Sequence, residues 1–119
     1  MRVRLARIAH ARSGDKGDRA DIGLFAYDAP SYEVLKREVT AALVAQHFAW
    51  LGAASVDAYP LDNLLAIKFV LNGALSGGAA RSLRSDNLGK TIGAALLRLE
   101  IELDAADVLR LPRLAGEDR

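Results

Sequence analysis

The chain has 119 residues, of which 51% are hydrophobic, and its 16 basic and 15 acidic side chains give a net charge of +1. This length accommodates one core, and the hydrophobic fraction argues against global disorder. The balanced charge argues against a nonspecific nucleic-acid binder, which needs a basic excess to engage phosphates. The lack of cysteine excludes disulfides, thiolate metal sites and cysteine nucleophiles, and it suits a reducing cytoplasm.

No segment is typical of membrane insertion or of metal binding. The N-terminal stretch MRVRLARIAH has no apolar run long enough for a signal peptide, and no run approaches the ~20 apolar residues of a membrane span. His10 and His47 are far apart and match no known ligand spacing. We therefore expect a cytoplasmic protein without a metal, a cofactor, a membrane contact or a nucleic-acid partner.

The first half of the chain predicts two strands and a helix. Near the N-terminus, Val3 and Leu5 alternate with basic residues, which is typical of a strand with one solvent-facing side. A charged loop over 12–20 follows, and residues 21–27 (DIGLFAY) form a second strand. Apolar residues at steps of three and four then predict a helix over 31–49, which Ser31 is expected to cap.

The second half predicts two more strands and a second helix. Residues 55–62 form a strand in which Pro60 indicates an edge or a bulge, and the apolar run 64–72 is expected at the centre of the sheet. A helix is predicted over 87–99. Residues 98–103 alternate like a strand but follow this helix without a turn, so both assignments stay open.

Two features of the second helix and of the chain end carry further expectations. Gly89 and Gly93 lie on one side of the helix, and glycine there predicts close packing against a neighbour. The segment 104–119, with Pro112, is expected to be frayed or used in oligomer contacts. The order of elements predicts one domain at 1–103 with an α+β fold: a ferredoxin-like sandwich with four or five strands and two helices on one face.

The first segment with possible chemistry is RSGDKGDRAD at residues 12–21. Its glycines permit unusual backbone geometry, and its cations can bind a carboxylate or a phosphate. The alternative is a solvated turn whose charges neutralise one another. The candidate ligand-binding residues are Arg12, Ser13, Gly14, Lys16 and Gly17, and the acid/base candidates are Asp15 and Asp18.

The second segment is NGALSGGAARSLR at residues 72–84. Glycine backbone amides, arginines and a helix start occur together there, which favours an anion site over a plain connecting loop. Its candidate ligand-binding residues are Asn72, Gly73, Gly77, Gly78, Arg81, Ser82 and Arg84. The later GKT at 89–91 lacks the first glycine of a phosphate-binding P-loop, so we do not assign it to a nucleotide triphosphate.

The histidines are weaker candidates. His47, next to Phe48, is expected to be a partly buried structural residue. His10 is expected at a strand end, where it could act as a general base or lie idle on the surface.

Together the motifs RSGDKGDRADIG and KFVLNGALSGGAARSLRSDNLGK resemble the ferredoxin-like domain at the C-terminus of acyclic terpene utilisation (AtuA) proteins, which also occurs as a separate small protein. The resemblance extends from about Ala6 to Leu103. The chain departs from the pattern at Asp18, Lys68 and Ser76. The resemblance implies catabolism of acyclic isoprenoids and branched acids as coenzyme A thioesters, and an AtuA-like large subunit as partner.

These expectations support two functions. The chain is either an accessory subunit that completes a site for an acyl-CoA or a carboxylate, or a noncatalytic assembly domain whose charged loops form interface salt bridges. A free-standing enzyme is the least supported reading. We also expect a homo-oligomer, because the chain has many apolar residues for a small domain to hide, namely Phe48, Trp50, Leu51, Val108, Leu109 and Leu111.

Overall fold

The computed structural model describes residues 1–16, 19–52, 55–73 and 88–114, with only the backbone described for Asp15, Lys16, Leu51 and residues 88–91. Its strands are β1 (Arg2–Arg4), β2 (Ala9–Lys16), β3 (Arg19–Ala26), β4 (Ser55–Leu61), β5 (Ala66–Asn72) and β6 (Glu100–Glu102). Its α-helices are α1 (Ala29–Glu38), α2 (Ala41–His47), α4 (Leu88–Leu97) and α5 (Ala105–Arg110). Short 3₁₀ turns are η1 (Leu5–Arg7), η2 (Ala49–Leu51) and η3 (Asp62–Leu64).

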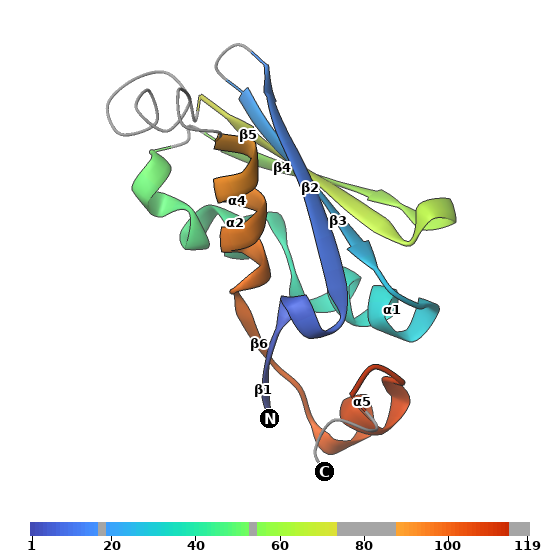
Figure 1. The fold of residues 1–119 in the computed structure, drawn as a ribbon. Helices are drawn as coiled ribbons and strands as arrows, with labels where there is room; N and C mark the ends of the chain where they lie inside the picture. Colours follow the sequence, from blue (N-terminus) through green and yellow to red (C-terminus); the bar gives the residue numbers. More distant parts are fainter. Residues whose placement is uncertain (17–18, 53–54, 74–87, 115–119) are drawn as a thin grey trace.

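The described strands form a four-stranded antiparallel sheet in the order β2-β3-β5-β4 and a small sheet of β1 with β6. Helices α2 and α4 lie side by side next to the larger sheet (Figure 1). The predicted α+β class is confirmed, and so is the central place of the apolar segment, since β5 lies between β3 and β4. Pro60 lies in β4 at the sheet edge, where its missing N–H costs no ladder bond.

The core lies between the helices and one face of this sheet. Along β3 every second side chain is buried, which is the period of a half-covered strand. The buried side chains that fill the space from the sheet and the helices include Ile22, Leu24, Phe69, Leu71, Leu35, Val44, Phe48, Ile92 and Leu96. The opposite face of the sheet therefore presents the alternate residues to solvent.

Helix α4 approaches β2 closely at Gly93. A Cβ atom on Gly93 would lie 3.0 Å from Ser13 Oγ and 3.8 Å from the Ala11 Cβ. The predicted close packing of the glycine side of this helix is confirmed at Gly93. Gly89 lies among the residues with only a described backbone.

The predicted charged loop is mostly strand. The N-terminal strand ends at Arg4, and after η1 the chain forms β2, which pairs with β3 from Ala9↔Ala26 to Lys16↔Arg19. The boundaries expected for the first strand and for a loop over 12–20 were therefore wrong. A strand with one face in water accepts charges at alternate positions, so a cluster of charges does not by itself indicate a loop. Gly17 and Asp18 lie outside the described residues.

The single helix predicted over 31–49 is two helices. Val39 has φ −98° and ψ 85°, which ends α1, and Thr40 begins α2 by accepting a hydrogen bond at Oγ1 from the Leu43 N–H at 3.1 Å. Asp28, rather than Ser31, caps α1, because its Oδ1 accepts from the Ser31 N–H at 2.8 Å. The apolar periodicity continued across the break and hid the cap at Thr40.

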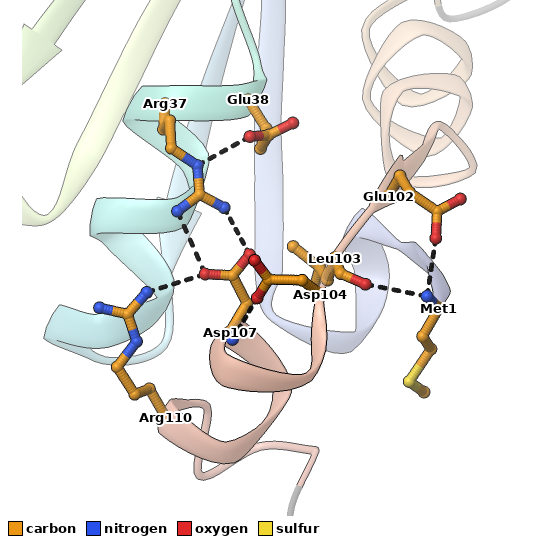
Figure 2. A network of polar contacts seen from close by, with 8 residues as sticks. All are labelled: Met1, Arg37, Glu38, Glu102, Leu103, Asp104, Asp107 and Arg110. Carbon is orange, nitrogen blue, oxygen red and sulfur yellow. Dashed lines mark hydrogen bonds and ion pairs between the residues drawn. The ribbon is translucent and has the colours of Figure 1, made fainter.

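The segment after residue 103 is folded as far as Leu114, so its expected fraying is wrong for residues 104–114. Asp104 caps α5 by accepting from the Asp107 N–H at 2.8 Å, and Leu111 and Leu114 are buried. Asp107 accepts two hydrogen bonds from the Arg37 guanidinium, at 3.1 and 2.7 Å, and one from Arg110 at 2.8 Å (Figure 2). These contacts tie α5 to α1.

The ambiguous segment 98–103 contains a strand and no helical residue. Helix α4 ends at Leu97, and β6 then pairs with β1 from Arg4↔Glu100 to Arg2↔Glu102. The Met1 amino group donates to Glu102 Oε2 at 2.7 Å and to the Leu103 carbonyl at 2.8 Å (Figure 2). The division into a domain at 1–103 and a tail at 104–119 stays a prediction. None of the helices in the described ranges has the length and apolarity to span a membrane.

Candidate functional site

The described parts of the two candidate segments meet at one end of the four-stranded sheet. The register pairs Lys16 with Arg19, Ala20 with Leu71 and Asn72 with Ser55. The C-terminal ends of β2 and β5 therefore lie at the same end of the sheet. The remaining candidates, Gly17, Asp18, Gly77, Gly78, Arg81, Ser82 and Arg84, lie outside the described residues.

The alternation of β2 places neighbouring candidates on opposite faces. Arg12 is exposed on the solvent-facing side of the four-stranded sheet, opposite the core, which we call the open face. Ser13, in contrast, is half-buried against Gly93 of α4. Gly14 lies opposite Asp21, whose Oδ1 is 3.4 Å from the place of a Cβ on Gly14. Arg12 is thus accessible to a ligand, while Ser13 also takes part in helix packing. Asp15 pairs with Ala20 through the backbone register.

The charged side chains on the open face lie in rows that the pairing of the strands sets. Arg12, Gly23 and Lys68 form one row across β2, β3 and β5. Lys68 Nζ lies 3.7 Å from Asp21 Oδ2, with both side chains about half exposed (49% and 47%), while Arg12 makes no ion pair with a described residue. Arg19, Ala20, Asp21, Lys68 and Val70 line a hollow of about 270 Å³ next to this row.

Asn72 and Gly73 shape the end of β5. Asn72 Nδ2 donates to Ser55 Oγ at 3.0 Å and to Asp57 Oδ2 at 2.9 Å, which fixes its amide against β4. Gly73 has φ 77°, a left-handed conformation that favours glycine and turns the chain out of the strand. The motif Asn-Gly therefore has a local structural reason at the sheet end, besides any contact with a ligand.

These segments belong to one known family. The family model of the AtuA ferredoxin-like domain matches residues 3–102. The chain belongs to the AtuA ferredoxin-like domain family. Searches of curated proteins and of solved structures gave no match. The family match confirms the ferredoxin-like fold class; it runs from β1 to β6 and ends before α5.

The open face of this AtuA ferredoxin-like domain also carries aromatic rings that the motif analysis did not assign to a site. The His10 ring stacks on Phe25 with centroids 5.2 Å apart, and Tyr27 lies 5.4 Å from His10. His10 is the second residue of β2, so its expected place at the end of a strand before the charged loop was wrong. The signal that could have revealed this surface is the two-residue period that joins His10 to Arg12 and Gly23 to Phe25.

The groups with clearly shifted pKa values serve structural contacts away from this end of the AtuA ferredoxin-like domain. Burial and a hydrogen bond to Asp62 at 2.5 Å raise the pKa of Tyr32 to about 12, and the same bond, with Lys36, lowers the pKa of Asp62. This contact fastens α1 to the β4–β5 turn, at the opposite end of these strands from Asn72.

Two other features bear on catalysis. His47 is half-buried, and its Nε2 lies 2.8 Å from the Ala95 carbonyl oxygen, so its predicted partial burial is confirmed. Within the described part of the AtuA ferredoxin-like domain, no group of three or more His, Asp or Glu side chains could hold a metal ion. The exposed cations that the described residues place on the open face include Arg12, Arg19 and Lys68.

Proposed function

We propose that this chain is a small or accessory cytoplasmic subunit that acts with an AtuA-like large subunit on acyclic isoprenoid or branched acyl-CoA and carboxylate compounds. Its part is to bind the anionic group of the substrate with the two Gly/Arg segments. The partner is proposed from the family, since the chain matches the AtuA ferredoxin-like domain and its motifs resemble the C-terminal region of larger AtuA proteins.

The observation that carries this proposal is the shared sheet end. The described parts of both candidate segments reach the same end of the sheet, with Lys16 in β2 and Asn72 in β5, which supports a ligand that contacts both. Arg12 is exposed and unpaired among the described residues, and a free guanidinium can hold a carboxylate with two parallel hydrogen bonds. Asp15 or Asp18 is proposed as the acid/base group, because both belong to the charged motif that carries Arg12 and Lys16.

A noncatalytic assembly domain is the second candidate, and exposed apolar side chains favour it. Leu109 is 84% exposed and Trp50 is 50% exposed. Such side chains gain from burial in an interface with the large subunit or with a second copy of the chain. In this case the charged segments would form salt bridges across the interface rather than bind a substrate.

The two functions are separated by reconstitution with an AtuA-like large chain from the same organism. Turnover of a branched acyl-CoA is measured with the large chain alone, with the wild-type small chain, and with Arg12→Gln. The accessory-subunit proposal expects that Arg12→Gln assembles normally but raises KM or lowers kcat. The assembly reading expects either full activity with Arg12→Gln or a loss of activity that follows a loss of assembly.

A further inference from the structure

A surface of rings and cations lies on the open face of the four-stranded sheet, entirely on residues that the structure describes. His10 and Phe25 are opposed across β2 and β3, and the next row holds Arg12, Gly23 and Lys68. Rows on one face of a sheet are about 7 Å apart, because two residues of a strand rise by that distance. The rings and the cations therefore adjoin.

The absence of a side chain at Gly23 sets the position of the Phe25 ring. Phe25 Cε1 lies 2.8 Å from the point that a Cβ on Gly23 would occupy, closer than a real Cβ would tolerate. The ring consequently covers Gly23 and lies low over the sheet. His10 stacks on it with an interplanar angle of 11°. Glycine at position 23 thus holds an aromatic ring between the strands that carry Arg12 and Lys68.

The cations beside the rings are available to a ligand. Arg12 has no ion pair with a described residue, and the 3.7 Å contact between Lys68 and Asp21 joins two half-exposed side chains. An exposed pair of this kind contributes little and exchanges readily for another anion. The hollow that Arg19, Asp21 and Lys68 line gives such an anion room beside the sheet.

We propose that this face binds a ligand that joins an aromatic ring to a phosphate, as an adenine nucleotide does. The ring packs against His10 and Phe25, and the phosphate lies between Arg12 and Lys68. Aromatic side chains stack on nucleobases, and arginine pairs with phosphate through its planar fork. The inference rests on the proposed function only where the nucleotide is that of coenzyme A, since a free nucleotide presents the same chemistry.

The charge of this face favours one nucleotide over a nucleic-acid strand. Asp21 and Asp57 lie in the row next to Arg12 and Lys68, on the same face. These carboxylates would repel the successive phosphates of a polymer, and the chain as a whole carries only +1. A ligand the size of one nucleotide can place a phosphate between the cations without extending along the carboxylates.

The test is a titration of the full, ¹⁵N-labelled chain with adenosine monophosphate, followed by amide shifts. We expect saturable shifts at open-face residues of β2, β3 and β5. Adenosine and ribose 5-phosphate should each bind more weakly, because adenosine lacks the phosphate and ribose 5-phosphate lacks the aromatic ring. If coenzyme A binds more tightly than adenosine monophosphate, the natural ligand is the nucleotide part of a coenzyme A thioester. If adenosine monophosphate binds more tightly, the natural ligand is a free nucleotide.

Three variants test the assignment of residues. Arg12→Gln should weaken binding of adenosine monophosphate about tenfold or more, as expected for a lost charge-assisted hydrogen bond. Gly23→Ala should weaken it about fivefold through loss of stacking, with little loss of stability, because the flexible Phe25 side chain can swing away. Arg98→Gln, which removes an exposed cation between α4 and β6, should bind like the wild type.

Several results would overturn the inference. They are the absence of shifts at the open face, wild-type affinity in both Arg12→Gln and Lys68→Gln, and an oligonucleotide that binds more tightly than its monomer. Any of them would leave the proposed function standing, because that function is tested by turnover with the large chain and a branched acyl-CoA.

Discussion

At the scale of single residues, Asp107 shows how one carboxylate fastens α5. It is buried and accepts hydrogen bonds from both Arg37 and Arg110. The two hydrogen bonds from Arg37 are the main cause that lowers the pKa of Asp107 from 3.8 to about 2, and the one from Arg110 adds to it. The charged carboxylate therefore stabilises the fold above about pH 4, and this stabilisation is lost as the pH falls through about 2.

We predict that Asp107→Asn lowers the melting temperature at pH 7 and flattens its decline between pH 4 and pH 2. Asparagine keeps the shape of the side chain but has no proton to gain in this range. Thermal melts by circular dichroism across this pH series measure the effect. Glu33→Gln, at an exposed carboxylate of α1, is the control and should keep the wild-type slope. An unchanged slope in Asp107→Asn would contradict the account.

At the scale of elements, α4 depends on the small size of Gly93 to approach β2. We predict that Gly93→Val destabilises the protein by about 1–3 kcal/mol, the usual cost of overpacking a filled contact. Ser13 Oγ already lies 3.0 Å from the first added carbon, and the branched methyls have less room still. Urea denaturation measures the loss. Ala94→Val, on the exposed side of the same helix, should change stability by under about 1 kcal/mol.

The α5 segment gives the second test at this scale, because it offers an exposed leucine in the helix and a buried leucine directly after it. Leu111 is fully buried just after the helix, whereas Leu109 is 84% exposed. We predict that Leu111→Ala costs about 2–5 kcal/mol, while Leu109→Ala stays within about 0.5 kcal/mol. Denaturation curves of the two variants compare them directly. Equal, small effects would mean that α5 is not part of the cooperative fold.

Elements with a regular spacing of apolar residues could be predicted from the sequence. Element boundaries that depend on a capping residue, and contacts that depend on strand register, could not. The central place of β5 followed from its largely apolar sequence, and the close contact of α4 followed from Gly93. The break at Thr40 was missed because apolar spacing continued through it. The cap at Asp104 was missed because the acidic, proline-containing segment was read as a tail.

The site was predictable only in part, for a similar reason. Sequence motifs identified Arg12 and Asn72, but only strand pairing shows that Asn72 lies at the end of the sheet and Arg12 lies in the row of Lys68. Lys68 and Phe25 lie in other segments and join Arg12 only through the register of β3 with β2 and β5. A contact across strands depends on which residues are opposed, and no local pattern in this chain states that pairing.

At the scale of the whole molecule, the expected homo-oligomer stays a prediction. Phe48 and Leu111 are buried within the chain, so they do not contribute to an interface, whereas Trp50 and Leu109 are exposed. We predict a dimer or a higher oligomer of the chain by multi-angle light scattering at micromolar concentration. Trp50→Lys should shift it toward monomer through the cost of burying a charge. A monomeric wild-type chain would contradict the prediction.

The central claim is that the two Gly/Arg segments bind one anion at the shared sheet end. Its most direct test is a calorimetric titration of a branched acyl-CoA into the complex with the large chain, for wild type and for Arg81→Ala, beside melting curves of both. We predict that Arg81→Ala weakens binding by ~1.5–3 kcal/mol, the value of a charge-assisted hydrogen bond, with almost unchanged melting temperature. A clear loss of stability with unchanged affinity would contradict the claim.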